Sequence, residues 1–585
     1  MQRKHILFLQ ILTLLPLLFF IGLYTDRNVI YLGIVFILLS LLLLNIYKFI
    51  KKEKLLQYPL WIVLVGSFYI YAFSGLGTTQ VPQSFEVLSE NDSPVVFDFK
   101  TSVPVDKMCY YVGIDKNVNF VLEYQKQGRW QKFYTYGNSY PYSFRWRCMK
   151  TGIHTSKVLL RVTKNKMMLN EVRFLSHDKI IPYTSRFSKL NDETDMKLDT
   201  SYHSGMYFDE IYHGRTAYEI LHGLRVYENT HPYLGKLLIT PGIKLFGMTP
   251  FGWRVSNVIF AGLMIFIFYY FALLLFKEKL YALGAGFLMT YGFMHIAQAR
   301  MAHIDTFSVF FVLLSYIFLY RFISRQKLVE LFTSGLFFGL ASAVKWSAVF
   351  SGLGFVLLLL YVIFSHHALL KRFRLSKLLL YGLYSYVLIG GMSYLLTFPE
   401  MYQRSGGLHA VINYNLNMYH YHSTMTQTHP YSSPWWSWPL DMKPMGYYKH
   451  YEGKLLSTIN AFGNPAVFWL GIVAVLYLIF VMFKKATLEA AVIISGFVGL
   501  YLPYVFVGRL MFIYHFYYAV PFLMLAIVYM FKDLITWSRY GYGLFAAYLL
   551  IVAGLFLAFY PVLSGYAVET SYVTTYLKWF STWWF

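Results

Sequence analysis

Two adjacent carboxylates, Asp209 and Glu210, lie in a segment rich in aromatic residues and histidine. Three cations, Arg300, Lys345 and Arg509, lie within or beside long apolar runs elsewhere in the chain. A positioned carboxylate can take the proton from an attacking hydroxyl. Arginine and lysine can both hold a phosphate that departs with its negative charge, arginine through two N–H groups and lysine as a point charge. These residue types predict transfer of a sugar from a lipid phosphate to a hydroxyl.

A phosphate is already a good leaving group, so this chemistry needs no separate general acid. Neighbouring residues of a helix or strand point in different directions, and Asp209 and Glu210 are therefore not expected to share one task. We predict that Asp209 is the base and that Glu210 orients the acceptor or stabilises the structure. The reverse order is the alternative.

Further residues are candidates for binding the acceptor or the sugar, because aromatic faces pack against the C–H surfaces of sugars. They are His231, Asp305, His420, His429, Trp435 and Trp438, and His422 and Trp436 belong to the same cluster of histidines and tryptophans. The alternative for the tryptophans is an interfacial aromatic belt.

The cations have structural alternatives too. A lysine in an apolar run is costly and so a functional candidate, but the Lys345 ammonium can instead reach the membrane interface. Arg300 and Asp305 can form an ion pair or a helix cap, and Arg509 can anchor a helix among lipid headgroups.

The composition places these residues in a membrane protein. Of 585 residues, 57% are hydrophobic and 14% are charged, whereas an ordinary soluble protein has about 25% charged residues. The net charge is +23, but the basic residues gather in short clusters between apolar runs, so we expect a bilayer and no nucleic acid as partner. We find no zinc-type spacing of Cys or His and no glycine-rich phosphate loop. No metal ligand set is predicted, and a divalent-cation requirement stays open.

About thirteen apolar runs are long enough to cross a bilayer as helices. They lie near 6–24, 29–47, 56–76, 256–276, 280–298, 303–322, 330–349, 350–365, 378–398, 464–482, 487–507, 510–531 and 542–563. With the N-terminus inside, this odd number puts every Lys and Arg cluster between the runs on the cytoplasmic side. Three segments then lie outside: 77–255, 399–463 and the tail from Ser564. We therefore expect a multi-pass protein of the cell membrane with an extracytoplasmic active site.

The first outer segment opens with about a hundred residues that have no helical period. Short alternating runs such as Val95-Val-Phe-Asp-Phe-Lys and Phe120-Val-Leu-Glu-Tyr predict an inserted, jelly-roll-like β-sandwich. It either binds carbohydrate or serves only in packing or assembly. Both cysteines, Cys109 and Cys148, fall in this domain, where an oxidising exterior favours a structural disulfide.

Ordered motifs across residues 207–585 resemble the protein O-mannosyltransferase family. The first motifs are Phe208-Asp-Glu, His231-Pro-Tyr-Leu-Gly-Lys-Leu, Phe251-Gly-Trp-Arg, Arg300 to Asp305 and Lys345-Trp-Ser-Ala. The later ones are Asn417-Met-Tyr-His-Tyr-His, His429-Pro-Tyr-Ser-Ser-Pro-Trp-Trp-Ser-Trp, Arg509-Leu-Met-Phe-Ile-Tyr-His-Phe and Phe559-Tyr-Pro-Val-Leu-Ser-Gly. The family is also called dolichyl-phosphate-mannose protein mannosyltransferase, and it belongs to the polyprenyl-phosphate-dependent, multi-spanning C-type glycosyltransferases.

This resemblance implies the C-type fold and an inverting transfer of mannose from a polyprenyl-phosphate carrier to Ser or Thr of an exported or membrane protein. It also implies that the acidic pair of the first outer loop lies at the catalytic centre. Eukaryotic members carry a β-trefoil domain in the second outer loop, which 399–463 is too short to hold. The chain also has two extra N-terminal helices and the β domain, so it is similar to a bacterial type.

The sequence thus predicts six parts. They are three N-terminal membrane helices (1–80), the β-sandwich (81–190), the first catalytic outer loop (191–255), helices of the catalytic core (256–398), the second outer loop (399–463), and C-terminal helices with an outer tail (464–585). Two other functions fit the same architecture. One is the same transfer onto a lipid, a glycan or a cell-wall polymer, and the other is transport of a lipid-linked sugar, whose ionisable groups tend to lie near the bilayer midplane.

Overall fold

The computed structural model describes residues 60–115, 117–137, 143–365, 367–403 and 406–585, which form two compact units. The helical unit contains the described residues up to Ser74, together with Glu228–Pro241 and Ser256–Phe585. The β unit contains Gly75–Tyr227 and Gly242–Val255. The helices predicted at 6–24 and 29–47 lie outside the described residues.

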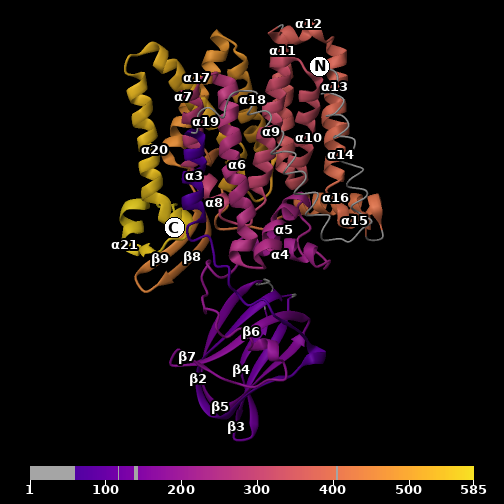
Figure 1. Cartoon of the computed structure of the whole chain (residues 1–585), viewed down its shortest axis with the longest axis vertical. Helices are drawn as coiled ribbons and strands as arrows, with labels where there is room; N and C mark the ends of the chain where they lie inside the picture. The colour runs from indigo at the N-terminus through magenta and orange to yellow at the C-terminus, as the bar shows by residue number, and fades with distance from the viewer. Residues whose placement is uncertain (1–59, 116, 138–142, 366, 404–405) are drawn as a thin grey trace. The chain divides into compact units, whose positions relative to one another are not determined.

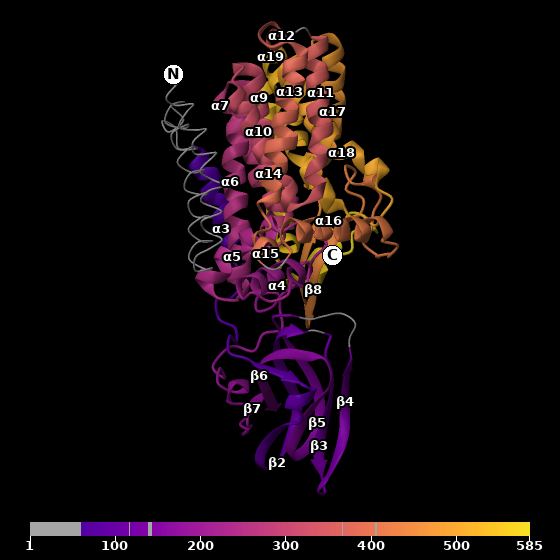
Figure 2. The same ribbon diagram turned by 90° about the vertical axis from the view of Figure 1, so that its right-hand side faces the viewer.

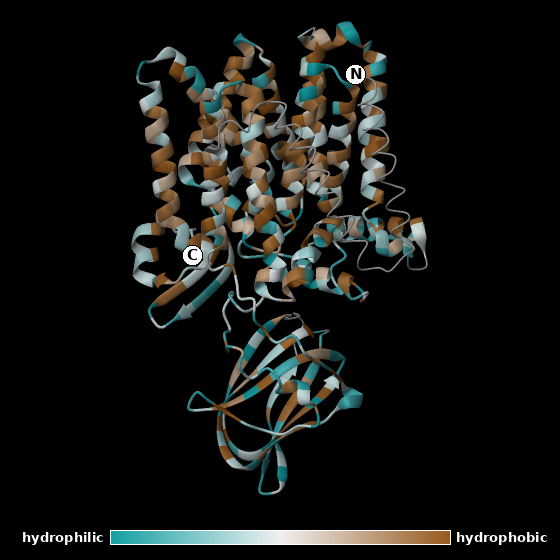
Figure 3. Ribbon diagram, viewed as in Figure 1, coloured by the Kyte–Doolittle hydropathy of each residue, from teal (hydrophilic) through white to brown (hydrophobic). Residues whose placement is uncertain are grey.

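Eight helices of the described part are long and apolar enough to cross a membrane. They are α6 (Pro250–Phe276), α9 (Asp305–Arg325), Trp346–Phe364 with α11 (Ser351–Phe364), Leu375–Leu395 with α13 (Leu375–Leu383) and α14 (Gly390–Leu395), α17 (Pro465–Lys484), Leu488–Phe506 with α18 (Leu488–Tyr501), α19 (Val520–Trp537) and α20 (Gly541–Ser564). Figure 3 shows apolar residues along most of their lengths. The prediction of a multi-spanning helical membrane protein is confirmed.

The other predicted spans differ in detail. The run 280–298 is a broken pair, α7 (Lys279–Thr290) and α8 (Phe293–Ala299), bent by 57° because Gly292 leaves the helical conformation between them. The run 510–531 becomes helical only at Val520, after the 3-10 turn Ile513–Tyr518. The described residues also include two shorter apolar helices, Trp61–Phe73 within α3 (Leu60–Phe73) and α10 (Leu328–Val344). The count of thirteen therefore stays a prediction.

Helices α9 and α10 form a hairpin that brings distant polar residues to one end. Asp305 begins α9 and Lys345 follows α10, so both lie at the end away from the turn. At the turn end, Arg321 donates to both carboxylate oxygens of Glu330 over 2.6 and 2.7 Å, and this buried pair fastens the two helices.

Glycines allow α10 to pack against the 375–395 segment. A Cβ built on Gly339 would lie 2.1 Å from the backbone oxygen of Gly390, and one on Gly335 would lie 2.2 Å from that of Ser385. Close packing of small residues is a main source of helix association in membranes, where burial from water contributes little. Here the backbones approach so closely that no side chain fits between them.

Gly339→Ala is therefore expected to destabilise the protein by about 1–3 kcal/mol, the usual cost of overpacking. Thermal unfolding in detergent would show it as a lower Tm. Gly391→Ala is the matched control, because a Cβ at Gly391 of α14 meets nothing within 4 Å. Equal Tm values for the two variants would contradict the packing argument.

The β unit is built on a seven-stranded sheet of antiparallel pairs in the order β1-β6-β2-β5-β3-β4, with β7 beside β6 (Figure 2). The strands are β1 (Glu86–Ser89), β2 (Val95–Asp115), β3 (Asn119–Lys126), β4 (Arg129–Gly137), β5 (Arg145–Lys164), β6 (Lys166–Ser176) and β7 (Lys179–Ile181). Alternate residues of β2, β3, β5 and β6 point into one apolar core. The antiparallel β domain is present where it was predicted, and the two-layer sandwich stays a prediction.

Cys109 of β2 and Cys148 of β5 are directly opposite each other and form the predicted disulfide. The remaining elements are shorter and connect the long ones (Figure 1). They are α4 (Glu210–Leu221), α5 (Leu234–Phe246), α12 (Ala368–Arg372), α15 (Pro399–Gln403), α16 (Gly407–Thr424), α21 (Thr570–Tyr572), and the three-stranded sheet of β8 (Met445–Glu452), β9 (Leu455–Ala461) and β10 (Val568–Glu569).

Candidate active site

In the β unit, the acidic pair lies at the start of α4, and its two members have different surroundings. Glu210 is fully buried and accepts two hydrogen bonds from Arg254, from Nε and from Nη2, each of 2.7 Å. Arg254 also donates to the carbonyl oxygens of Leu76 and Gly205, at 2.7 and 3.0 Å. Burial of both partners and four strong contacts make Glu210–Arg254 a fixed structural element.

Asp209 directly precedes α4 and is partly exposed. Successive helical residues point about 100° apart, because a turn takes about 3.6 residues, so the two carboxylates leave the backbone in different directions. The arrangement favours the predicted order, because Glu210 holds the turn that carries Asp209. The role of Asp209 as the base stays a prediction.

In the helical unit, Asp305 and Lys345 form a buried ion pair. Lys345 Nζ lies 2.8 and 3.1 Å from the two oxygens of Asp305. Asp305 also accepts a hydrogen bond of 3.3 Å from Tyr518 and lies 3.2 Å from His303 Nδ1. Asp305 thus pairs with Lys345, and the alternative of an ion pair between Arg300 and Asp305 stays untested.

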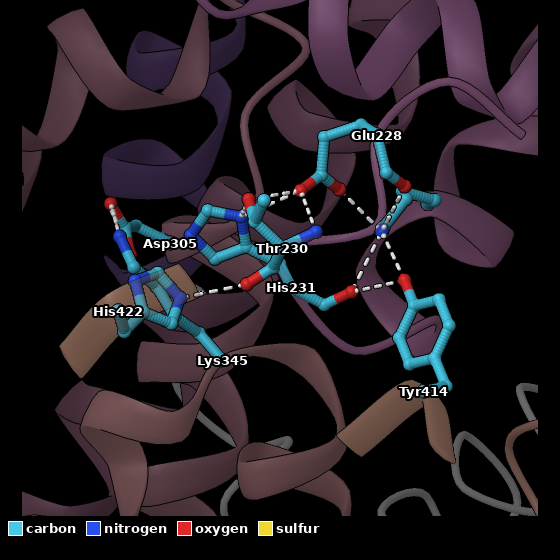
Figure 4. Close-up of polar contacts among 8 residues, drawn as sticks. Glu228, Thr230, His231, Asp305, Lys345, Tyr414 and His422 are labelled. Atoms are coloured by element: carbon cyan, nitrogen blue, oxygen red, sulfur yellow. Dashed lines mark hydrogen bonds and ion pairs between the residues drawn. The ribbon is translucent and has the colours of Figure 1, made fainter. Parts of the chain in front are cut away.

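A second polar network surrounds Glu228, which the sequence did not single out (Figure 4). Lys236 Nζ donates to Glu228 over 2.5 Å and to the carbonyl oxygen of His231 over 2.8 Å. His231 Nδ1 lies 3.1 Å from the other Glu228 oxygen. Tyr414 of α16 donates to the same carbonyl oxygen of His231, at 2.8 Å. The loop that carries His231 is therefore fixed by Lys236 of α5 and by Tyr414 of α16.

Positive charges gather around His231. His422 of α16 donates from Nε2 to the carbonyl oxygen of Thr230 over 2.7 Å, and its ring centroid is 5.6 Å from that of His231. Burial, together with the charges of Arg509, His231 and Lys345, lowers the pKa of His422 to about 4, and the hydrogen bond to Thr230 opposes this shift. Burial also lowers the pKa of His231, assisted by Lys345 and Lys236 and opposed by Glu228. Two imidazoles with lowered pKa values and the cations Lys345 and Arg509 therefore act on one region, a combination that can hold an anion.

The low pKa of His422 predicts loss of stability in acid. Its folded pKa, about 4, lies below the ordinary value of 6.5, so the folded state binds fewer protons between these values and its stability falls as pH falls from 6.5 towards 4. The Tm is expected to drop by several degrees between pH 7 and pH 5. In His422→Gln, whose amide can also donate to Thr230, the drop is expected to be smaller. An identical drop in both proteins would assign the acid sensitivity to other groups.

Two predicted residues have mainly structural surroundings. Arg300 is buried and donates to the carbonyl oxygens of Tyr71, Ala72, Ser74 and Ser564, between 2.7 and 3.2 Å. It therefore ties the end of α3 to the end of α20, and its contact with phosphate stays a prediction. Trp438 has no exposed surface, donates to Ser433 and stacks on His515. Its contact with sugar also stays a prediction, because both observations describe a packing role.

The other predicted residues lie nearer to the surface of the helical unit. Trp435 is partly exposed and packs on Tyr501, and His420 and His429 are exposed. Arg509 is partly exposed in the segment before the turn Ile513–Tyr518. Sequence reasoning missed Glu228, Lys236 and Tyr414. The charged pair in Glu228-Asn-Thr-His-Pro-Tyr-Leu-Gly-Lys was a signal for the first two, since an apolar helix seldom holds an unpaired lysine.

Two family descriptions match the chain. Residues 230–393 match "Dolichyl-phosphate-mannose-protein mannosyltransferase", and residues 408–583 match "C-terminal four TMM region of protein-O-mannosyltransferase". Both begin after Asp209 and Glu210, so the acidic pair lies outside the matched ranges.

Curated relatives come from bacteria. A polyprenol-phosphate-mannose–protein mannosyltransferase of Corynebacterium glutamicum is 25% identical over 431 residues, which is 60% of this chain and 81% of the relative. Its counterpart of the same name in Mycobacterium tuberculosis is 24% identical over 438 residues, which is 62% of this chain and 84% of the relative.

A solved structure shares the fold. The Saccharomyces cerevisiae protein O-mannosyltransferase Pmt1-Pmt2 complex bound to the sugar donor has a TM-score of 0.57 at 13% identity, over 64% of this chain and 89% of that chain. This likeness supports the predicted C-type glycosyltransferase fold. With the two family matches and the bacterial relatives, it establishes that the chain belongs to the protein O-mannosyltransferase family, as a bacterial-type member.

Proposed function

We propose that this protein transfers mannose from a polyprenyl-phosphate carrier to a Ser or Thr hydroxyl of an exported or membrane protein, with inversion at the anomeric carbon. The names of the bacterial relatives support the donor and the class of acceptor. The observation that carries the chemistry is the division of the acidic pair. Glu210 is occupied by Arg254, whereas Asp209 is partly exposed at the start of α4. We therefore assign the partly exposed carboxylate, Asp209, as the base.

In the proposed reaction, the acceptor oxygen forms a bond to the anomeric carbon of mannose as the bond from that carbon to the phosphate oxygen breaks. Asp209 accepts the proton of the acceptor hydroxyl. The bonding electrons leave with the polyprenyl phosphate, which gains negative charge. No group needs to protonate this leaving group.

The leaving phosphate requires positive charge, and the helical unit supplies it. Lys345 and Arg509 are close enough to His422 to lower its pKa together, so their charges act on one region. His231 and His422 border the same region as hydrogen-bonding groups. We assign Lys345 and Arg509 to the carrier phosphate, with His231 beside them, and leave Asp305 the task of fixing Lys345.

The outer-face assignment rests on the distribution of charge along the helical unit. In the α9–α10 hairpin, Arg321, Arg325 and Lys327 lie at the turn end, and Asp305 and Lys345 lie at the opposite end. Basic clusters favour the cytoplasmic side, so the end with Lys345 is proposed to be extracytoplasmic.

Arg509→Met tests the phosphate assignment. A hydrogen bond to a charged group contributes about 1.5–3 kcal/mol, so the donor KM is expected to rise about 10- to 150-fold. Arg509→Lys is expected to keep part of the affinity, because the charge remains. Arg539→Met, at an exposed arginine after α19, is the matched control. A normal donor KM in Arg509→Met would remove Arg509 from the phosphate site.

The function itself is tested by following radiolabelled mannose from polyprenyl-phosphate-mannose into an extract of membrane and secreted proteins. Label in protein, released as mannose by β-elimination from Ser or Thr, is the expected result. Label in lipid, glycan or polymer would change the acceptor. Movement of intact donor across vesicles without cleavage would indicate transport, and no use of the donor would contradict the proposal.

A further inference from the structure

The helix that carries Asp209 is held by the β sheet. Residues Gly75–Tyr227 form one compact unit, so α4 belongs with the seven strands and not with the bulk of the membrane helices. A base must be held within a fraction of an ångström of its productive position to be effective. The contacts between α4 and the strands therefore bear directly on Asp209.

The main contact is Arg215, a buried arginine in the second turn of α4. Its Nε donates to Glu219, one turn later, over 2.9 Å. Its Nη1 donates to the carbonyl oxygen of Asp115, at the end of β2, over 3.1 Å, and to Ser143 Oγ over 3.4 Å. The guanidinium carbon lies 4.0 Å from the ring centroid of Tyr227. One guanidinium thus connects α4, the end of β2, the start of the β5 region and the segment after α4.

The end of β2 is itself rigid. The Asp115 carboxylate accepts hydrogen bonds from Val118 N at 2.9 Å and from the hydroxyl of Tyr136, on β4, at 3.0 Å. Both side chains are buried. The carbonyl oxygen that receives Arg215 is therefore fixed by two other parts of the sheet.

The chain just before α4 is held by the same region. Phe144 N donates to Gly113 of β2 over 3.0 Å, and Met206 N donates to the carbonyl oxygen of Phe144 over 3.1 Å. The Phe144 ring packs on Tyr218 of α4, at 5.1 Å between centroids. Gly205 lies so near the strand that a Cβ there would be 2.6 Å from Arg145 Cβ. The sheet thus supports the chain on both sides of Asp209.

We propose that the β sheet is a positioning scaffold for the catalytic turn, and that Arg215 is the positioning residue through which it holds Asp209 in place. This inference rests on the proposed function, because it takes Asp209 as the base. It assigns the β domain to the catalytic unit itself, whether or not a sugar binds to it.

The test compares Arg215→Met, Arg215→Lys and Tyr227→Leu with the wild-type full-length protein in detergent. Hydrogen–deuterium exchange is measured for peptides covering α4 and, as an internal reference, β6. Transfer kinetics are measured with polyprenyl-phosphate-mannose. Arg161→Met is the matched control, because Arg161 is an exposed arginine of the same sheet that pairs with Glu123 over 3.4 Å at the surface.

In Arg215→Met, faster exchange is expected in α4 and unchanged exchange in β6. A displacement of about 1 Å can cost 10²-fold in rate, so kcat is expected to fall about 10- to 100-fold while the donor KM stays within about twofold. Arg215→Lys is expected to recover part of kcat, since its ammonium can still reach Glu219. Arg161→Met is expected to match the wild type in both measurements.

Unchanged exchange in α4 of Arg215→Met would overturn the inference, as would an unchanged kcat with faster exchange. Faster exchange of β6 in Arg215→Met would mean that this variant loosens the whole sheet. The milder Tyr227→Leu is then judged instead, by the exchange of α4 and by kcat. Failure of the wild type to use the donor would instead contradict the proposed function. The exchange measurement would still show whether Arg215 holds α4.

Discussion

Replacing Asp209 by asparagine is expected to lower kcat about 10²- to 10⁴-fold, the range that a general base contributes. Asparagine keeps the size of the side chain but cannot accept the proton of the acceptor hydroxyl. Since the donor phosphate is assigned to Lys345 and Arg509, the donor KM is expected to change little. The measurement is the initial rate of mannose transfer at varied donor concentration, with the Tm as a check on folding.

The matched control is Asp195→Asn, at an exposed aspartate of the segment before α4. It loses the same charge in the same unit and is expected to keep the wild-type rate. A kcat for Asp209→Asn within tenfold of wild type would assign the base to another group. A large rise in donor KM with normal kcat would assign Asp209 to donor binding instead.

Much of the architecture follows from residue patterns that act over short distances. Apolar runs of about twenty residues predict the spans, and alternating β-branched and aromatic residues predict the sheet, because each pattern describes the face that one element buries. The Cys109–Cys148 disulfide was predicted from location alone, and the strands place the two residues opposite each other.

Which side chains meet is harder to predict, because it depends on elements that are distant in sequence. Glu210 and Arg254 are 44 residues apart, and Lys236 and Tyr414 are 178 apart. No local pattern encodes those distances. Asp305 and Lys345, 40 residues apart, were both recognised as candidates, but only the α9–α10 hairpin shows that they pair with each other.

Sequence also says little about how deeply a polar or aromatic side chain is buried. Arg300 and an arginine that binds phosphate look alike in the sequence, yet Arg300 contacts four backbone carbonyl oxygens. Trp438 belongs to a tryptophan cluster typical of sugar binding, yet it has no exposed surface. Lipid-facing, buried and substrate-facing aromatics share one composition in a membrane protein, so only the fold separates them.

The second large effect is expected at the Glu210–Arg254 pair. Arg254→Met removes one partner and leaves the Glu210 carboxylate buried without it, which costs about 3–5 kcal/mol for a buried pair. A fall in Tm well beyond that of Arg161→Met is expected, because an exposed pair such as Arg161–Glu123 contributes only about 0–1 kcal/mol. Activity is expected to fall with it, since the pair holds the turn of Asp209.

Glu210→Gln combined with Arg254→Met separates loss of the pair from loss of the buried charge. If the cost in Arg254→Met comes from the unpaired carboxylate, neutralising Glu210 in the same chain is expected to restore part of the Tm. Activity is expected to recover less than the Tm, because Leu76 and Gly205 still lack the contacts of Arg254. A double variant no more stable than Arg254→Met would show that these two backbone contacts, and not the ion pair, fix the turn that presents Asp209.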